Sequence, residues 1–404
     1  MKTIPHKTER IHSLDSLRAI MMLLGLVLHS ALTFGVHNYG EAWPLKDPNA
    51  THPLNDLLVG VIHLFRIPIF FVVAGFFGSM LFYERRPLKM FKNRVSRIAY
   101  PFIVFLPILT PIILFSFIFT GSIFNGDEAA LETTLSYFSN PLIFIPQSTY
   151  HLWFLYYLFL ITLLTLCLGL LFKKVPNLTS NITKAFDWII KKPVLRILFL
   201  AFLTFILYEF MNTKEVVTSV SFIPDLNTFL FYFQFYIFGW VLFKSKHLLD
   251  KMMRFDWLYT ILGLTTTLIY LLMFEALTFE IFILIKSISV WLLIFGITGL
   301  FVRYGSSHSP RMRYVSDATY WVYLIHLPLT VIIPSLIIDW PLPATIKFLI
   351  VLISMTTICF ITYNYLVRGT FIGKFLNGRK YTRKLFDIKK VEELSKLKSD
   401  ANTV

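Results

Sequence analysis

Charged residues and cysteine are both scarce in this chain. Only 15% of its 404 residues are charged and two are cysteines, whereas charged residues make up about a quarter of an ordinary soluble domain. So low a share of charge excludes an ordinary soluble enzyme. Cys167 and Cys359 each lie inside an apolar stretch, so we expect no disulfide framework, no metal site and no redox cofactor.

Apolar residues are abundant instead. They make up 56% of the chain, with 42 phenylalanines among them, and they gather in stretches that approach the roughly 20 residues of a membrane-crossing helix. The pattern predicts an all-α, polytopic membrane helix bundle with about ten transmembrane helices. We expect these helices near residues 14–36, 56–82, 94–120, 150–172, 194–211, 226–243, 256–274, 280–302, 316–338 and 344–366.

Acidic residues are also few, 23 against 38 lysines and arginines, which gives a formal net charge of +15. The basic residues gather in alternate loops, whereas the loops between hold little besides Lys46 and Lys214. Cytoplasmic loops of membrane proteins carry such an excess, so we expect the basic loops and both termini in the cytoplasm. The sequence contains no nucleic-acid recognition module, so we do not attribute the positive charge to nucleic-acid binding.

Three parts of the chain follow from this pattern. We expect a cytoplasmic segment over residues 1–13, a transmembrane domain over 14–366 and a basic cytoplasmic tail over 367–404. The first apolar stretch contains Asp15, Arg18 and His29 and lacks a small-residue cleavage pattern. It is therefore expected to be a retained helix rather than a signal peptide.

Ionisable residues inside the predicted spans are costly, so each is a candidate for function or for a structural pair inside the bundle. His29 follows Arg18 by eleven residues in the first span. That is about three helical turns, which places both on one face about 16 Å apart. In the second span Arg66 follows His63 by three residues, so these two also share a face.

Four further residues complete the candidate set. Arg94 and Arg97 lie at the cytoplasmic mouth of the third span, where paired guanidinium groups suit phosphate or carboxylate and where loop charge is the plainer explanation. His151 opens the fourth span and His326 lies inside the ninth. An interfacial anchor or a hydrogen bond between helices explains one histidine equally well, but three in separate spans favour a site. We give less weight to Glu209, Glu275, Glu280 and Lys286.

These residues suit acyl transfer. A neutral histidine can accept a proton from a sugar hydroxyl, and the reaction then needs a donor held close and positive charge where an oxyanion develops. A basic cytoplasmic mouth that leads to His29 suits acyl-CoA, with its phosphates on arginine. No serine or cysteine has the setting of a nucleophile, which favours direct transfer.

The chain resembles the acyltransferase type 3 superfamily of integral membrane enzymes over most of residues 10–368. The resemblance rests on Arg18 with His29, on Arg94-Val95-Ser96-Arg97 and on Tyr323-Leu324-Ile325-His326-Leu327-Pro328. It implies His29 as the catalytic histidine, Arg18 in its support, and Arg94 with Arg97 at a cytoplasmic donor site. To these we add His326 as a catalytic candidate and His63, Arg66 and His151 as substrate-binding candidates.

The stretches Leu14–Ala19, His63–Arg66 and His151–Leu155 look closest to members that place succinyl groups on osmoregulated periplasmic glucans. This resemblance implies a bacterial inner-membrane enzyme that moves a succinyl group from cytoplasmic acyl-CoA to glucan hydroxyls, with no permanently bound cofactor. An O-acetyltransferase of another envelope glycan, a polysaccharide exporter and a scaffold of a glycan-synthesis complex stay open. No motif specifies the acyl group, the glycan or the oligomeric state.

Overall fold

A computed structural model describes residues 12–216, 218–307, 309–378 and 380–381, which form helices, turns and loops without strands. The first half of the chain forms α1 (His12–Leu32), α2 (Pro53–Arg85), α3 (Pro87–Arg94), α4 (Tyr100–Phe124), α5 (Ala130–Tyr137), α6 (Trp153–Phe172) and α7 (Pro176–Ile190). The second half forms α8 (Pro193–Met211), α9 (Leu226–Lys244), α10 (Asp256–Leu272), α11 (Phe279–Tyr304), α12 (Pro310–Ser335), α13 (Ala344–Thr362) and α14 (Phe371–Asn377). Short 3-10 segments lie at Gly40–Ala42, Pro141–Phe144, Tyr150–Leu152 and Lys246–Phe255, and π-helical turns at Val95–Ala99 and Tyr363–Val367.

Ten helices of the described residues are long and apolar enough to cross a membrane, which confirms the predicted all-α class and number of spans. Their ends differ by a few residues from the predicted ends. For example, α12 begins at Pro310 rather than near 316, because the Ser309 side chain accepts a hydrogen bond from the Met312 backbone and Pro310 occupies the first turn. A capping serine and a proline thus start this helix earlier than its apolar stretch suggests.

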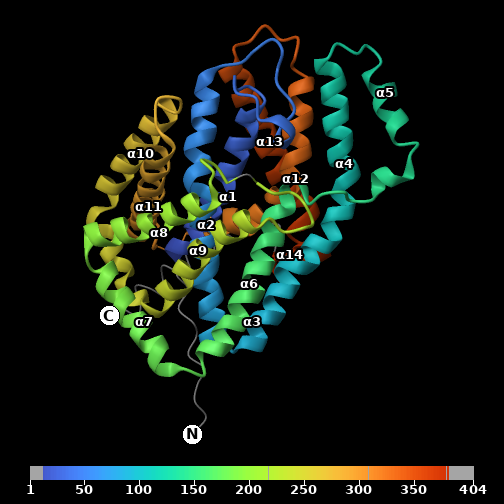
Figure 1. Ribbon diagram of the computed structural model, residues 1–404. Coiled ribbons are helices and arrows are strands. Elements are labelled where there is room, and N and C mark those ends of the chain that lie inside the picture. Colours follow the sequence, from blue (N-terminus) through green and yellow to red (C-terminus); the bar gives the residue numbers. More distant parts are fainter. Residues whose placement is uncertain (1–11, 217, 308, 379, 382–404) are drawn as a thin grey trace, which may run out of the picture.

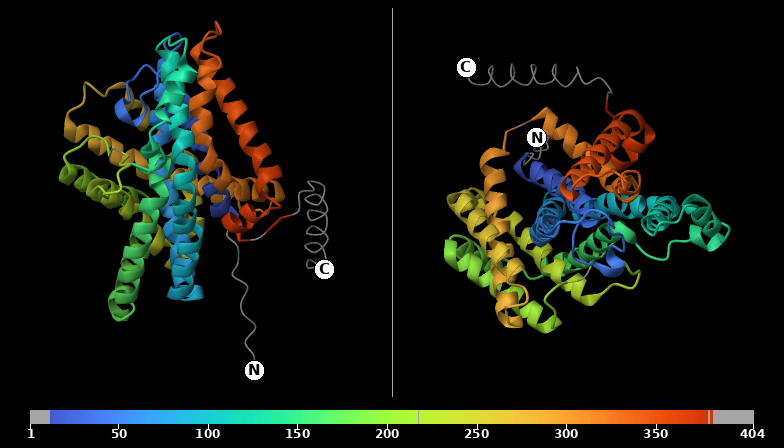
Figure 2. Two further views of the ribbon diagram at one scale, coloured as in Figure 1. Left: turned by 90° about the vertical axis from the view of Figure 1, so that its right-hand side faces the viewer. Right: turned by 90° about the horizontal axis from the view of Figure 1, so that it is seen from above.

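The two N-terminal helices α1 and α2 lie at the centre of the bundle (Figures 1 and 2). Helices α8 to α11 lie on one side of them and α4, α12 and α13 on the other, with α5 at the far edge beside α4. The most extensive packing joins α2 to α9 and α10 to α11. Most residues near the middle of α1 and α2 are therefore at least partly buried in the protein.

Glycines let α2 and α9 pack with their backbones in contact. A β-carbon at Gly239 would lie 1.9 Å from the backbone oxygen of Val72, and one at Gly75 would lie 2.0 Å from that of Tyr236. Close helix pairs in membranes depend on such small residues, because apolar side chains gain little by leaving lipid for a helix surface. The α2–α9 pair is therefore a closely packed support for the residues that α2 carries.

One end of the bundle holds the lysine and arginine clusters, and we call it the basic end. It contains residues 84–97, 173–192, 244–256, 303–307, 309–317 and 368–378. Helices α1 and α12 both begin there, since His12 and Met312 line the same small pocket. Helix α14 also lies there, because the Asn377 side chain donates to the backbone oxygen of Asp317. That this end faces the cytoplasm stays a prediction.

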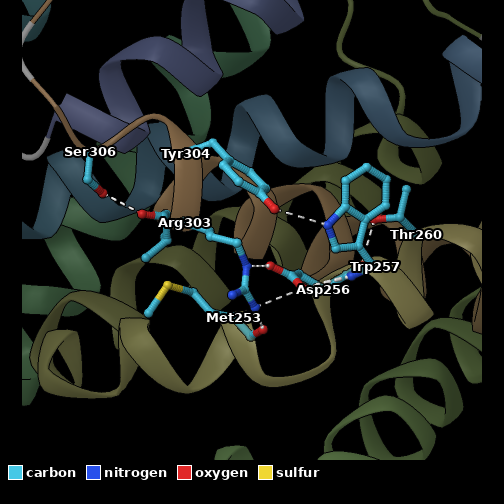
Figure 3. Close-up of polar contacts among 8 residues, drawn as sticks. Met253, Asp256, Trp257, Thr260, Arg303, Tyr304 and Ser306 are labelled. Carbon is cyan, nitrogen blue, oxygen red and sulfur yellow. Dashed lines mark hydrogen bonds and ion pairs between the residues drawn. The ribbon is translucent and has the colours of Figure 1, made fainter.

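An ion pair closes α10 against α11 at the basic end (Figure 3). Arg303 Nε lies 2.6 Å from Asp256 Oδ2, and Arg303 Nη2 lies 3.1 Å from Asp256 Oδ1. Arg303 Nη2 also donates to the backbone oxygen of Met253. A bidentate pair of this kind fixes orientation as well as distance, so it holds the two helix ends in register.

The predicted terminal segments are described only in part. Residues 1–11 and 382–404, which make up most of the two predicted segments, lie outside the described residues. The predicted tail starts at the last residue of the π-helical turn Tyr363–Val367 and then forms α14, which contacts α12 and the π-helical turn before α4. This part of the predicted basic tail is therefore packed on the bundle.

Candidate active site

Three imidazole rings from separate parts of the chain meet inside the bundle. The ring centroids of His29 in α1 and His326 in α12 are 5.2 Å apart, and those of His326 and His151 are 5.3 Å apart. His151 belongs to the 3-10 turn that leads into α6 rather than to α6 itself. The expectation that these three histidines belong to one site is therefore supported by their geometry.

Backbone oxygens orient two of the three rings. His326 Nδ1 lies 2.7 Å from the oxygen of Tyr323, and His151 Nε2 lies 3.1 Å from the oxygen of Leu324. A carbonyl oxygen can only accept, so each of these nitrogens carries the hydrogen of its neutral ring. The other nitrogens, His326 Nε2 and His151 Nδ1, are buried and have no partner among the described residues. Each neutral ring thus keeps a free lone pair within the cluster.

His29 differs from both, because neither of its ring nitrogens has a hydrogen-bond partner among the described residues, and Nδ1 is buried. Its ring lies between that of His326 and that of Trp43, whose centroid is 5.8 Å away. Packing rather than hydrogen bonding therefore positions this imidazole. The neutral ring therefore keeps one lone pair that no group of the described residues occupies, and a general base needs such a lone pair.

The loop between α1 and α2, residues 33–52, folds back over His29. Trp43 is buried, its Nε1 donates to Thr33 Oγ1 at 3.1 Å, and its ring meets the edge of Phe117 at 5.6 Å. The loop is held by an ion pair of 3.1 Å between Asp47 Oδ2 and Lys347 Nζ, both fully buried. This loop forms a fixed wall beside the imidazole at the end of the bundle opposite the basic end.

The first turn of α2 holds the start of this loop. Asp56 accepts hydrogen bonds from the backbone of Val36 and His37 and from the hydroxyl of Tyr39. Burial and the neighbouring Asp56 carboxylate raise the pKa of Tyr39, so this hydroxyl stays protonated and keeps donating at physiological pH. A β-carbon at Gly35 would lie 2.2 Å from Asp56 Oδ1, which explains the glycine at that position.

Arg66 approaches α1 one turn before His29. Its Nη1 lies 1.9 Å from the place that a β-carbon on Gly25 would occupy, so only glycine leaves room for the guanidinium group. Arg66 has no hydrogen bond or ion pair among the described residues, and its Nε is buried. A positive charge therefore lies about 6 Å along the helix axis from His29.

His63, on the same helix as Arg66, belongs to the edge of the site. It is exposed, although it lies in the middle of α2, and the charges of Arg66, Lys286 and Glu215 act on it. Lys286 donates to the backbone oxygen of Lys214 at 2.8 Å. Charged protein groups therefore lie near His63. Because charged groups avoid lipid, we assign the accessible surface of His63 to space between helices.

Two arginines of the candidate set lie close together at the basic end. Arg18 Nη2 is 3.4 Å from both Asp15 Oδ1 and Ser316 Oγ, and Arg94 Nη2 donates to the backbone oxygen of Ala74 at 3.2 Å. The charge of Arg18 acts on Arg94. Arg18 is separated from His29 by about 16 Å along α1, the distance of three helical turns. Arg18 therefore does not touch the histidine that it was expected to support.

Arg97 has different neighbours from Arg94. Its Nη1 donates to the backbone oxygen of Phe375 in α14 at 2.9 Å, and its Nη2 lies against Gly378. The chain between the two arginines is a π-helical turn, Val95–Ala99. Such a turn contains more residues than an α-helical one, so a spacing of three no longer directs two side chains to one partner. The expected pairing of these guanidinium groups is not found.

Comparison with known proteins adds the family. A model of an acyltransferase domain matches residues 11–364. The chain belongs to the acyltransferase type 3 family. It is 26% identical to "Glucans biosynthesis protein C" of Escherichia coli strain K12 / DH10B and 27% identical to that of E. coli O81 strain ED1a, in both cases over 94% of this chain and 97% of the relative. No solved structure matches the chain.

Membership of this family and the ten apolar helices together make the protein a multi-pass membrane acyltransferase. Among the described residues, no group of three or more histidine, cysteine or acidic side chains could hold a metal ion.

Several residues of the site were not expected from the sequence. Trp43, Asp47 and Lys347 shape the wall over His29, and Gly25 makes room for Arg66. Lys347 could have been noticed, because it is an ionisable residue inside an apolar stretch. The others have no local signal, since their partners come from distant parts of the chain.

Proposed function

We propose that this acyltransferase moves a succinyl group from acyl-CoA at the cytoplasmic face to a hydroxyl of a periplasmic glucan, and that it works in the bacterial inner membrane. The observation that carries the proposal is the setting of His29, whose two unpartnered nitrogens lie beside the free lone pair of His326. The names of the E. coli relatives support a glucan as the acceptor.

The reaction is a direct transfer with His29 as general base. His29 accepts the proton of the acceptor hydroxyl while the hydroxyl oxygen bonds to the thioester carbonyl carbon. The carbonyl oxygen becomes an oxyanion next to the positive charge that the protonated His29 now carries. The oxyanion then collapses, the carbon–sulfur bond breaks, and the thiolate leaves with the proton that His29 accepted. The products are an ester on the acceptor and free CoA thiol.

The donor approaches from the basic end. Arg18 and Arg94 suit the phosphates of the nucleotide, because they lie near one another and Arg18 is about 16 Å from His29 along α1. Guanidinium groups bind phosphate oxygens in pairs. Arg97 is bound to α14, and we assign it the role of holding that helix at the mouth of the donor site.

The test compares His29→Ala with wild type in a strain whose own glucan acyltransferase gene has been deleted. Periplasmic glucans are analysed by mass spectrometry for added acyl mass, after membrane levels of the two proteins have been matched. Removing a general base costs typically about 100- to 10,000-fold in rate, so the succinyl mass should appear with wild type alone. His37→Ala, a change of an exposed histidine in the loop after α1, is the matched control and should acylate normally.

Three other results would contradict parts of the proposal. An acetyl mass on another envelope glycan would show that the donor and the acceptor differ from the proposed ones, although the reaction would still be acyl transfer. Glucan export that depends on the protein without any acyl mass would show an exporter. Equal acylation by wild type and His29→Ala would remove His29 from the reaction.

A further inference from the structure

The guanidinium group of Arg66 lacks a counter-charge in the described part of the protein. Two other cations inside the bundle have partners: Lys347 pairs with an aspartate, and Lys286 donates to a backbone oxygen. Arg66 has neither kind of partner, and its Nε is buried. An unpaired cation away from water is costly, and pairing with an anion lowers that cost. The anion has to come from outside the described residues.

The position of Arg66 shows which part of a substrate could supply this anion. Its Nη1 lies against Gly25, one turn and about 6 Å from His29 along α1. Arg18, which with Arg94 suits nucleotide phosphates, lies at the basic end, about 16 Å from His29 along α1. Arg66 is thus next to the place where the acyl group reacts rather than next to the nucleotide.

The neighbours of Arg66 leave the charge uncompensated. Tyr232 in α9 and Tyr323 in α12 are neighbours of Arg66. A tyrosine hydroxyl is neutral at physiological pH, so neither balances the positive charge of Arg66. Tyr323 already donates its hydrogen to the backbone oxygen of His151 at 2.6 Å. The site therefore offers a fork of guanidinium donors to an acceptor that carries negative charge.

We propose that Arg66 binds the free carboxylate of a dicarboxylic acyl group and thereby makes this enzyme select succinyl donors over neutral donors of the same length. The inference rests on the proposed acyl-transfer function and adds the residue that recognises the acyl group. A guanidinium fork fits both oxygens of a carboxylate. A neutral acyl group leaves Arg66 unpaired, and sites built for a charged or polar group discriminate strongly against analogues that lack it.

The experiment uses the purified full chain in detergent with a glucan acceptor and two donors, succinyl-CoA and butyryl-CoA. These donors have the same number of acyl carbons and differ in the terminal carboxylate. We expect wild type to prefer succinyl-CoA. Arg66→Gln should lower kcat/KM for succinyl-CoA roughly 10- to 150-fold, the loss of a hydrogen bond to a charged group, and should leave the value for butyryl-CoA close to that of wild type.

Gly25→Ala is a second variant that keeps the charge. The added β-carbon overlaps the guanidinium position, so Arg66 has to move, and we expect the same selective loss with succinyl-CoA. If Arg66→Gln fails to fold, this variant and Arg66→Lys still report on the site, because Lys keeps a positive charge but lacks the planar fork. Arg66→Lys should retain part of the preference for succinyl-CoA.

The outcomes separate this inference from the proposed function. Equal losses with both donors would show that Arg66 serves the oxyanion or the fold and not the carboxylate, and would overturn the inference. Equal use of the two donors by wild type would also overturn it while leaving acyl transfer intact. No transfer from either donor by wild type would overturn the inference and the proposed function together.

Discussion

The ion pair between Asp47 and Lys347 allows one prediction to be worked out in detail. Both side chains are fully buried and 3.1 Å apart, and Lys347 Nζ also donates to the backbone oxygen of Ile338 at 2.8 Å. Lys347→Met leaves the Asp47 carboxylate buried without its counter-ion, and breaking such a pair typically costs about 3–5 kcal/mol.

The structure places the expected loss at the lower end of that range. Asp47 Oδ1 also accepts hydrogen bonds from the backbone N–H groups of Asn49 and Ala50, which compensate part of the stranded charge. We therefore expect Lys347→Met to lower the free energy of unfolding by about 3 kcal/mol. Adding Asp47→Asn should recover part of the loss, because asparagine removes the charge and keeps an oxygen for both N–H groups.

The assay is equilibrium unfolding of the purified protein in detergent, followed by tryptophan fluorescence. Lys246→Met is the matched control, because Lys246 and Glu84 form an ion pair of nearly the same length, 3.2 Å, with side chains 54% and 31% exposed. An exposed pair is worth about 0–1 kcal/mol. Equal effects of Lys347→Met and Lys246→Met would refute the reasoning, since burial would then have no influence on the cost.

Three further predictions concern other parts of the bundle. Trp43→Ala should lower kcat about tenfold and KM much less in steady-state acylation, because the ring beside His29 is lost while the proposed donor site at the basic end is untouched. Gly239→Ala should reduce the folded fraction seen by size-exclusion chromatography, since the new methyl group overlaps the Val72 backbone oxygen. Asp256→Asn, which breaks the ion pair of Figure 3, should lower thermal stability but leave the relative use of the two donors unchanged.

The membrane helices could be predicted because their signal is local. Each span is a continuous apolar stretch, and ten such stretches alternate with basic and non-basic loops. Helix ends were less predictable where a cap extends the helix beyond the apolar stretch, as Ser309 and Pro310 do for α12. Hydropathy measures transfer to lipid and says nothing about a side chain that satisfies a terminal N–H group.

The sequence allowed the residues of the candidate site to be predicted, but not how they are arranged in space. The cost of an ionisable group in a membrane singled out His29, Arg66, His151 and His326, and the structure brings them together. Their contacts depend on pairs far apart in the chain, such as residues 29 and 326. Periodicity within one helix cannot supply such distances, and it was wrong for Arg94 and Arg97, where it assumed an α-helical turn.

The π-helical turn before α4 has a consequence for mutational studies of the Arg-x-x-Arg segment. One additional residue in a turn rotates everything after it by about 100° around the helix axis. Arg94, which precedes the turn, contacts α2, and Arg97, which lies within it, contacts α14. The two arginines of this short motif therefore take part in separate sets of contacts. Effects of residues without shared partners add, so the double substitution should cost the sum of the single ones. Deleting one residue from the turn should disturb both contacts at once.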